Sequence, residues 1–137
     1  MEVFFYGLFM DSAILLKNGV RPSNPRKGYL NGYVLKIGNR ASLIPCVGER
    51  SYGIVMTVDA NTIKDLYAEP SVADYIPEEV EIITDANESV KAVCYNLPSE
   101  SLTGANEAYA KSLYELAKRE GFPDDYLKKI KKMTRTT

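Results

Sequence analysis

The chain has 137 residues, 45% of them hydrophobic and 26% charged, which is typical of a folded globular domain and not of a disordered chain. Its 17 basic and 18 acidic residues give a net charge of −1, so charge does not favour nucleic acid or an anionic membrane as a partner. The sequence has no histidine and two cysteines, which excludes Ser-His-Asp and Cys-His catalysis and a Cys/His metal site. We expect one domain over residues 1–137.

No apolar run approaches the roughly 20 residues of a membrane span, and the N-terminal residues lack the basic region of a signal peptide. These observations predict a cytoplasmic protein with no membrane partner. Cys46 and Cys94 each lie beside apolar residues, so we expect both to be buried small hydrophobes. A disulfide between them is left open.

The first elements are short. Val3 to Tyr6 is a run of β-formers and predicts a buried strand that ends at Gly7. Asp11 or Ser12 then caps a short helix over residues 13–17.

The sequence of residues 28–37 allows two interpretations. The Asn31-Gly32 pair is a hairpin signal, and a single strand bent at the glycine is the alternative. Two further strands are expected, over residues 42–45 and 52–58, the second rich in β-branched residues.

Asp59 is placed to cap the next helix, in which Ile63 and Leu66 fall at helical spacing. We expect this helix to end near Glu69, because proline at position 70 disfavours helical geometry in the residue before it. Two strands follow, over residues 75–83 and 89–95.

The pattern becomes helical from residue 105 onward. One apolar stripe consists of Tyr109, Leu113, Leu116 and Ala117. Residues 123–133 predict a last short helix, and we expect Tyr109 and Tyr126 to be packing residues. Residues from about 128 to 137 are expected to form a basic, partly flexible tail, with cations favoured near a helix C-terminus over a nucleic-acid contact.

Five or six short strands therefore precede the main helix, with two short helices between them. This order is not the βαβα alternation of a doubly wound sheet. It predicts an α+β fold, a small mixed β-barrel flanked by helices.

Without histidine, proton transfer falls to Glu, Asp, Lys, Tyr or Cys. Glu69 is the carboxylate whose position stands out, because it lies between a helix end and a strand start and has Tyr67 and Tyr75 nearby in sequence. Partial desolvation there would suit it to acid–base work. From the residues alone, a surface glutamate at a turn is the other interpretation.

The second candidate is the strand–loop junction made of Phe5, Tyr6, Gly7, Leu8, Phe9 and Met10. Glycine after an aromatic strand allows a sharp turn and a close approach to a ligand, and exposed N–H groups there can hold an anion. A tight turn that carries core residues is the plainer interpretation.

Together and in this order, these segments resemble the gamma-glutamylcyclotransferase-like superfamily over nearly the whole chain. The matching segments are the strand and YGSL-type loop at Val3–Met10, the Gly-Tyr-rich strand at Gly28–Leu35, Gly53–Val58, the acidic residue Glu69, Tyr75 with Val80–Ile82, Ala92–Tyr95, and Phe122–Leu127.

The resemblance implies a barrel with a cavity near the loop and a small gamma-glutamyl substrate. Loop backbone groups hold the gamma-glutamyl moiety, and Tyr6, Gly7, Leu8, Phe9 and Met10, together with the tyrosine at position 75, become substrate-binding candidates. Glu69 becomes the catalytic acid–base residue for cyclisation to 5-oxoproline, with release of the amine. No metal or organic cofactor is needed.

The sequence also departs from the family pattern. Leu8 replaces the loop serine, Leu66 stands where aspartate is usual, Pro70 follows the acid in place of glycine, and Pro77 replaces an arginine. These changes keep open an alternative in which the chain binds a small amine-containing ligand or a protein partner without catalysis.

Overall fold

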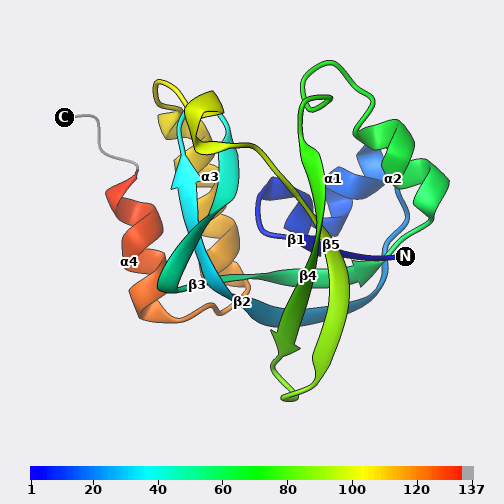
Figure 1. Cartoon of the computed structure of the whole chain (residues 1–137), viewed down its shortest axis with the longest axis horizontal. Helices are drawn as coiled ribbons and strands as arrows, with labels where there is room; N and C mark the ends of the chain where they lie inside the picture. Colours follow the sequence, from blue (N-terminus) through cyan, green and yellow to red (C-terminus); the bar gives the residue numbers. More distant parts are fainter. Residues whose placement is uncertain (134–137) are drawn as a thin grey trace.

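In the computed structural model, which describes residues 1–133, five strands close into a mixed barrel in the order β1-β3-β2-β4-β5 (Figure 1). The strands are β1 (Glu2–Phe5), β2 (Ser23–Ile37), β3 (Ala41–Thr57), β4 (Ile76–Thr84) and β5 (Ser89–Asn96). β1 and β5 pair in parallel, and the other neighbours are antiparallel. The α+β barrel predicted from the sequence is confirmed.

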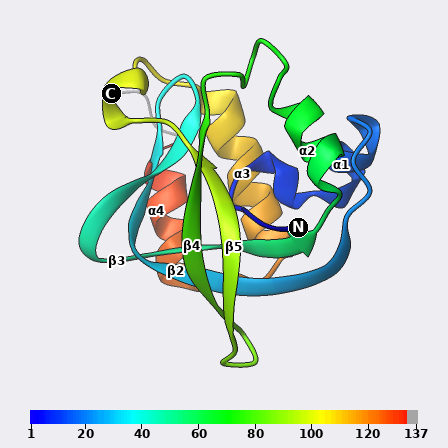
Figure 2. The same ribbon diagram turned by 45° about the vertical axis from the view of Figure 1, so that its right-hand side comes forward.

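Short helices flank this barrel. They are α1 (Ser12–Lys17), α2 (Ala60–Leu66), α3 (Glu107–Arg119) and α4 (Asp124–Lys132), with 3-10 helices η1 (Leu8–Met10) and η2 (Ser99–Ser101). α3 and α4 pack against each other, α4 and α2 lie at opposite edges of the molecule in Figure 1, and the β4–β5 hairpin extends past the barrel (Figures 1 and 2). Within residues 1–133, no helix has the length and apolar character needed to cross a bilayer.

Side-chain caps fix where the helices begin. The Asp11 carboxylate accepts a hydrogen bond from the Ala13 N–H at 3.0 Å, and the Asp59 carboxylate accepts from the N–H groups of Asn61 and Thr62. Both predicted caps are thereby confirmed.

β2 is one long strand, so the hairpin alternative at Asn31-Gly32 is wrong. Gly32 has φ +81 and marks a register shift against β3, where Asn31 pairs with Arg50 and Tyr33 pairs with Pro45. The extra residues 46–49 of β3 bulge out at this point, which joins the two short strands expected over 42–45 and 52–58 into one.

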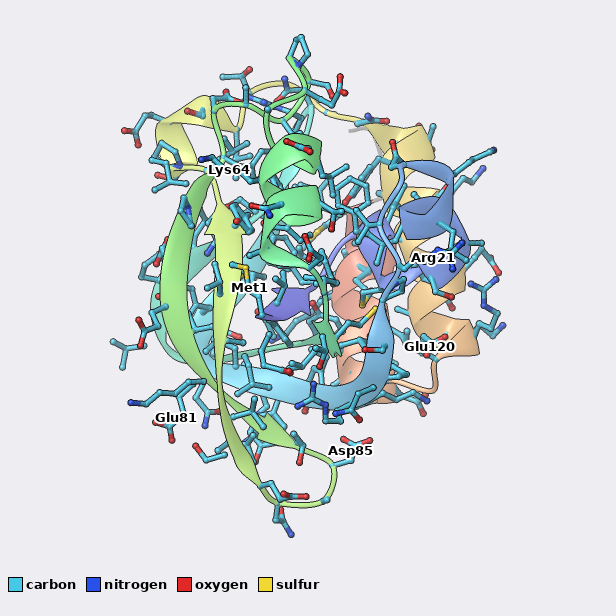
Figure 3. All side chains as sticks on the ribbon, turned by 90° about the vertical axis from the view of Figure 1, so that its right-hand side faces the viewer. Met1, Arg21, Lys64, Glu81, Asp85 and Glu120 are labelled. Atoms are coloured by element: carbon cyan, nitrogen blue, oxygen red, sulfur yellow. The ribbon has the colours of Figure 1, made fainter. Side chains whose placement is uncertain are left out.

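The core is centred on β1 and the inner face of the barrel. Val3, Phe4 and Phe5 of β1 are all at most 3% exposed, as a strand covered on both faces requires. On β4 the inward residues Val80 and Ile82 alternate with exposed acids, whose outward direction is visible at Glu81 in Figure 3.

The two cysteines have different environments. Cys94 is fully buried, as expected, whereas Cys46 is exposed on the bulge of β3 and the expectation of a buried residue there is wrong. Both are free thiols, and burial raises the pKa of Cys94 far above its ordinary value.

The last helix carries much of the basic C-terminal segment. Residues 128–132 belong to α4, which is anchored by buried Tyr126 and Ile130. The Tyr126 ring contacts the Tyr52 ring at 5.0 Å between centroids, so the predicted packing role of Tyr126 is confirmed. The rest of the predicted tail, from residue 134 onward, lies outside the described residues.

Candidate functional site

A cavity of about 380 Å³ opens beside the end of β1. Its walls come from the end of β1 and the turn after it, the tip of the β2–β3 hairpin, the loop between α2 and β4, and the start of α3, with one residue each from α1 and β5. Most of its lining is aromatic or aliphatic. A small ligand could be largely enclosed here, with few polar groups to orient it.

The turn after β1 forms one wall of the cavity. Tyr6, Gly7, Leu8 and Phe9 all line the cavity. The Tyr6 hydroxyl fixes the turn to β5 by donating a hydrogen bond to the Tyr95 carbonyl at 2.7 Å.

Gly7 is required by the close approach of α3 to this turn. A Cβ atom at position 7 would overlap with the hydroxyl oxygen of Tyr109. That hydroxyl in turn accepts a hydrogen bond from the Leu8 N–H at 3.3 Å. Because Gly7 has no side chain, the Tyr109 hydroxyl of α3 can come close enough to hold the turn.

This arrangement predicts the effect of Gly7→Ala. The added methyl group should push the Tyr109 ring away and break its bond to Leu8, which costs about 1–3 kcal/mol of unfolding free energy, as overpacking usually does. Urea unfolding of both single variants and of Gly7→Ala/Tyr109→Phe measures this. The cost of Gly7→Ala should fall when the hydroxyl is absent, and an equal cost in both backgrounds would show that the overlap is not its cause.

A second part of the lining is a tyrosine cluster. The rings of Tyr67 and Tyr95 stack at 3.8 Å with an angle of 8° between their planes, and the Tyr75 ring lies 6.1 Å from the Tyr67 ring. The Tyr75 hydroxyl donates to the Ala41 carbonyl at 2.7 Å, which ties the α2–β4 loop to the hairpin tip.

Burial keeps these phenols neutral. It raises the pKa of Tyr6 and of Tyr67 well above the ordinary value. It raises the pKa of Tyr109 to about 12, although the hydrogen bond from Leu8 opposes the shift. At neutral pH the cavity therefore offers O–H donors and no phenolate.

An ion pair borders the cavity at the hairpin tip. The Arg40 guanidinium binds both carboxylate oxygens of Asp74, at 2.6 and 2.8 Å, and also donates to the Ser71 carbonyl at 3.4 Å. Of the described residues that line the cavity, Arg40 alone carries a charged side chain, and its ion pair with Asp74 balances that charge.

The same pair predicts a pH dependence. Hydrogen bonds from Arg40 hold the pKa of the Asp74 carboxyl below its ordinary value. The stabilisation that the pair provides is therefore complete above the unfolded-state pKa of Asp74 and is lost as the pH falls through the lower folded-state pKa. An NMR titration of the carboxyl carbons should show Asp74 titrating low in the wild type and at an ordinary pH in Arg40→Gln; no difference between the two would refute the coupling.

Glu69 lies three residues beyond α2, which ends at Leu66 and not near Glu69 as expected. The chain leaves the helix where the Tyr67 ring stacks on Tyr95, and i→i+3 bonds such as Val72 N–H to the Glu69 carbonyl (3.0 Å) continue it as a series of turns. Its side chain is exposed, so the partial desolvation expected of it is not found. Glu69 is not among the residues that line the cavity, although Tyr67 and Val72 of the same loop are.

Of the other predicted site residues, Met10 alone does not line the cavity. Tyr75 lines the cavity together with the turn residues 6–9. Met10 is 3% exposed and does not; it lines a second hollow with Arg119.

Sequence reasoning missed Tyr109 and Arg40. Tyr109 was expected only to pack, because it belongs to the apolar stripe of α3, and Arg40 stands in a loop-like stretch with no periodic pattern. Both reach the cavity through contacts between segments far apart in the chain, which no local pattern encodes.

Comparison with known proteins gives a family match. The AIG2-like family matches residues 50–130, which is more than half of the chain. No curated protein sequence matches it significantly.

Several solved structures share the fold. A structure described as gamma-glutamyl cyclotransferase is 20% identical, with a TM-score of 0.77 over 99% of this chain and 89% of that one. The uncharacterized protein loc79017 from Homo sapiens is 20% identical, with a TM-score of 0.76 over 98% of this chain and 88% of that one. YkqA from Bacillus subtilis is 19% identical, with a TM-score of 0.76 over 98% of this chain and 54% of that one.

At these identities the structural likeness shows the fold alone, and the family model supplies the relationship. The chain belongs to the AIG2-like family, and it shares its fold with the structure described as gamma-glutamyl cyclotransferase.

Proposed function

We propose that this protein is a cyclotransferase that converts a gamma-glutamyl amine or peptide to 5-oxoproline and releases the amine, with Glu69 as acid–base residue. One observation carries the proposal: the cavity brings the turn at residues 6–9 and the loop that contains Glu69 together at one opening. The resemblance assigns substrate binding to the first of these segments and acid–base chemistry to the second.

The reaction needs orientation more than a strong nucleophile, because the attacking amine belongs to the substrate itself. In the proposed mechanism the Glu69 carboxylate, after a change of side-chain rotamer, takes a proton from the substrate's α-ammonium group. The freed nitrogen attacks the gamma-carbonyl carbon, and a five-membered ring closes.

The same residue then completes the reaction. The bond between the gamma-carbon and the leaving nitrogen breaks, and the proton held by Glu69 passes to that nitrogen. The ring nitrogen, which still carries two hydrogens after the attack, gives one of them to the released amine, which leaves as an ammonium ion. The carboxylate is regenerated, no water is consumed, and the ring product is 5-oxoproline. The apolar lining supports this sequence, because exclusion of water limits competing hydrolysis.

The test is release of 5-oxoproline from a panel of gamma-glutamyl amines, gamma-glutamyl dipeptides and glutathione. Turnover of at least one member is expected, and the preferred member identifies the leaving group. A folded protein that releases no 5-oxoproline from any member would overturn the proposal.

A second candidate function has its own observation. The described lining contains neither Asp nor Glu, and the Glu69 side chain is exposed outside it. A protein that binds a small amine-containing ligand or a partner without catalysis needs no carboxylate there, and Leu8 adds bulk to the turn. Competitive binding of gamma-glutamyl compounds with no product would favour this function over cyclotransfer.

A further inference from the structure

The hydroxyl of Tyr109 joins α3 to the turn after β1, across 101 positions of sequence. Because the Leu8 N–H donates to this oxygen, that N–H is engaged within the protein. A direct contact from the Leu8 backbone to a substrate oxygen, of the kind the family resemblance suggests, would require this bond to break.

The proton of Tyr109 itself is not used in the same way. Tyr6 and Tyr75 donate their protons to the carbonyls of Tyr95 and Ala41, but the described residues offer the Tyr109 proton no acceptor. The residue lines the cavity, so this donor is available to a ligand.

The chemistry of the group matches such a role. Its pKa of about 12 keeps the phenol protonated at neutral pH. A hydroxyl that accepts a hydrogen bond becomes a stronger donor, because hydrogen bonds in a chain polarise one another. The Leu8 N–H and the Tyr109 O–H thus form a short chain of hydrogen-bonding groups that ends at a donor in the cavity lining.

We propose that Tyr109 donates this hydrogen bond to the gamma-carbonyl oxygen of the substrate and stabilises the oxyanion that forms on it. The inference rests on the proposed cyclotransferase function and names the donor that the function requires. It also explains Gly7, whose missing side chain leaves room for this hydroxyl.

Three other hydroxyls line the cavity, those of Tyr67, Tyr95 and Ser71, and no hydrogen bond holds their protons within the described residues. None of the three accepts from the Leu8 N–H, so each lacks the bond that joins the Tyr109 hydroxyl to the backbone of the turn.

The experiment compares Tyr109→Phe, Tyr67→Phe and Tyr126→Phe with the wild type. Tyr126 is the matched control, because it is a buried tyrosine outside the cavity whose hydroxyl donates to a backbone carbonyl, at 3.5 Å from the Tyr52 oxygen. Steady-state kinetics on the preferred panel substrate should show kcat reduced about 100-fold in Tyr109→Phe, the usual cost of one oxyanion donor, with KM changed far less. Tyr126→Phe should keep its kcat.

The division between kcat and KM separates this role from a structural one. If Tyr109 only held the turn in place, its loss would displace the binding wall and raise KM while kcat changed little. Three results would overturn the inference. The first is such a rise in KM with little change in kcat. The second is a kcat of Tyr109→Phe within threefold of the wild-type value, and the third is a large loss of kcat in Tyr67→Phe in place of Tyr109→Phe.

Binding of 5-oxoproline, followed by NMR, separates failure of the inference from failure of the proposed function. Suppose that the wild type binds 5-oxoproline but turns no substrate over, and that Tyr109→Phe binds it more weakly. Tyr109 would then be a donor to the carbonyl group, and the proposed cyclotransferase function would be wrong. Turnover by the wild type with no effect of Tyr109→Phe on kcat would support the proposed function and overturn the role of Tyr109. A wild type that neither binds nor reacts would overturn both.

Discussion

Glu69→Gln should lower kcat for 5-oxoproline release by about 10²- to 10⁴-fold, the range that a positioned acid–base residue contributes. Glutamine keeps the size and the hydrogen-bonding capacity of the side chain but cannot accept and return the proton. The measurement is steady-state release of 5-oxoproline from the preferred substrate of the panel.

The exposure of Glu69 makes this experiment easy to interpret. A surface substitution usually changes the free energy of unfolding by less than about 0.5 kcal/mol, so lost activity cannot be attributed to lost structure. Glu79→Gln is the matched control, since Glu79 is an exposed glutamate on β4 that does not line the cavity. Equal activity in wild type and Glu69→Gln would exclude Glu69 as the proton carrier.

Ile82→Ala should destabilise the fold by about 2–5 kcal/mol, because Ile82 is 0% exposed inside the barrel and its removal leaves a cavity. The site is tightly packed: a Cβ added at Gly28 would lie 2.9 Å from an Ile82 methyl carbon. The free energy of unfolding from urea denaturation gives the value directly.

The same strand supplies the control for this prediction. Ile76 is an isoleucine of β4 that is 56% exposed, and Ile76→Ala should change stability by less than about 0.5 kcal/mol. Similar losses in the two variants would contradict the assignment of the barrel interior as the core of the fold.

Local sequence patterns predicted the fold well wherever one residue controls an element boundary. Asp11 and Asp59 cap helices, and their side chains make the bonds that a cap requires within three residues. The alternation along β4 likewise predicts a strand with one wet face, because the period of side chains in a strand is fixed by its geometry.

Prediction failed where distant contacts override local preference. The sequence predicted two short strands, over residues 42–45 and 52–58, but pairing with β2 on both sides of the bulge keeps β3 continuous. Pro70 suggested that the helix before it extends to Glu69, but the Tyr67–Tyr95 stack turns the chain earlier.

The candidate site was predicted only in part for the same reason. The turn at residues 6–9 is a local feature and was found from its aromatic strand and glycine. Tyr109 reaches that turn from α3, and Arg40 reaches Asp74 from the hairpin tip, so neither could be assigned to a site without the tertiary structure.

The most direct test of the central claim is the identity of the products when the preferred gamma-glutamyl substrate reacts in water enriched in oxygen-18. Cyclotransfer by the substrate's own amine predicts free amine and 5-oxoproline in equal amounts, with no oxygen-18 in the 5-oxoproline and no glutamate. Glutamate that carries oxygen-18 in its gamma-carboxylate would show that water is the nucleophile, and would contradict the account.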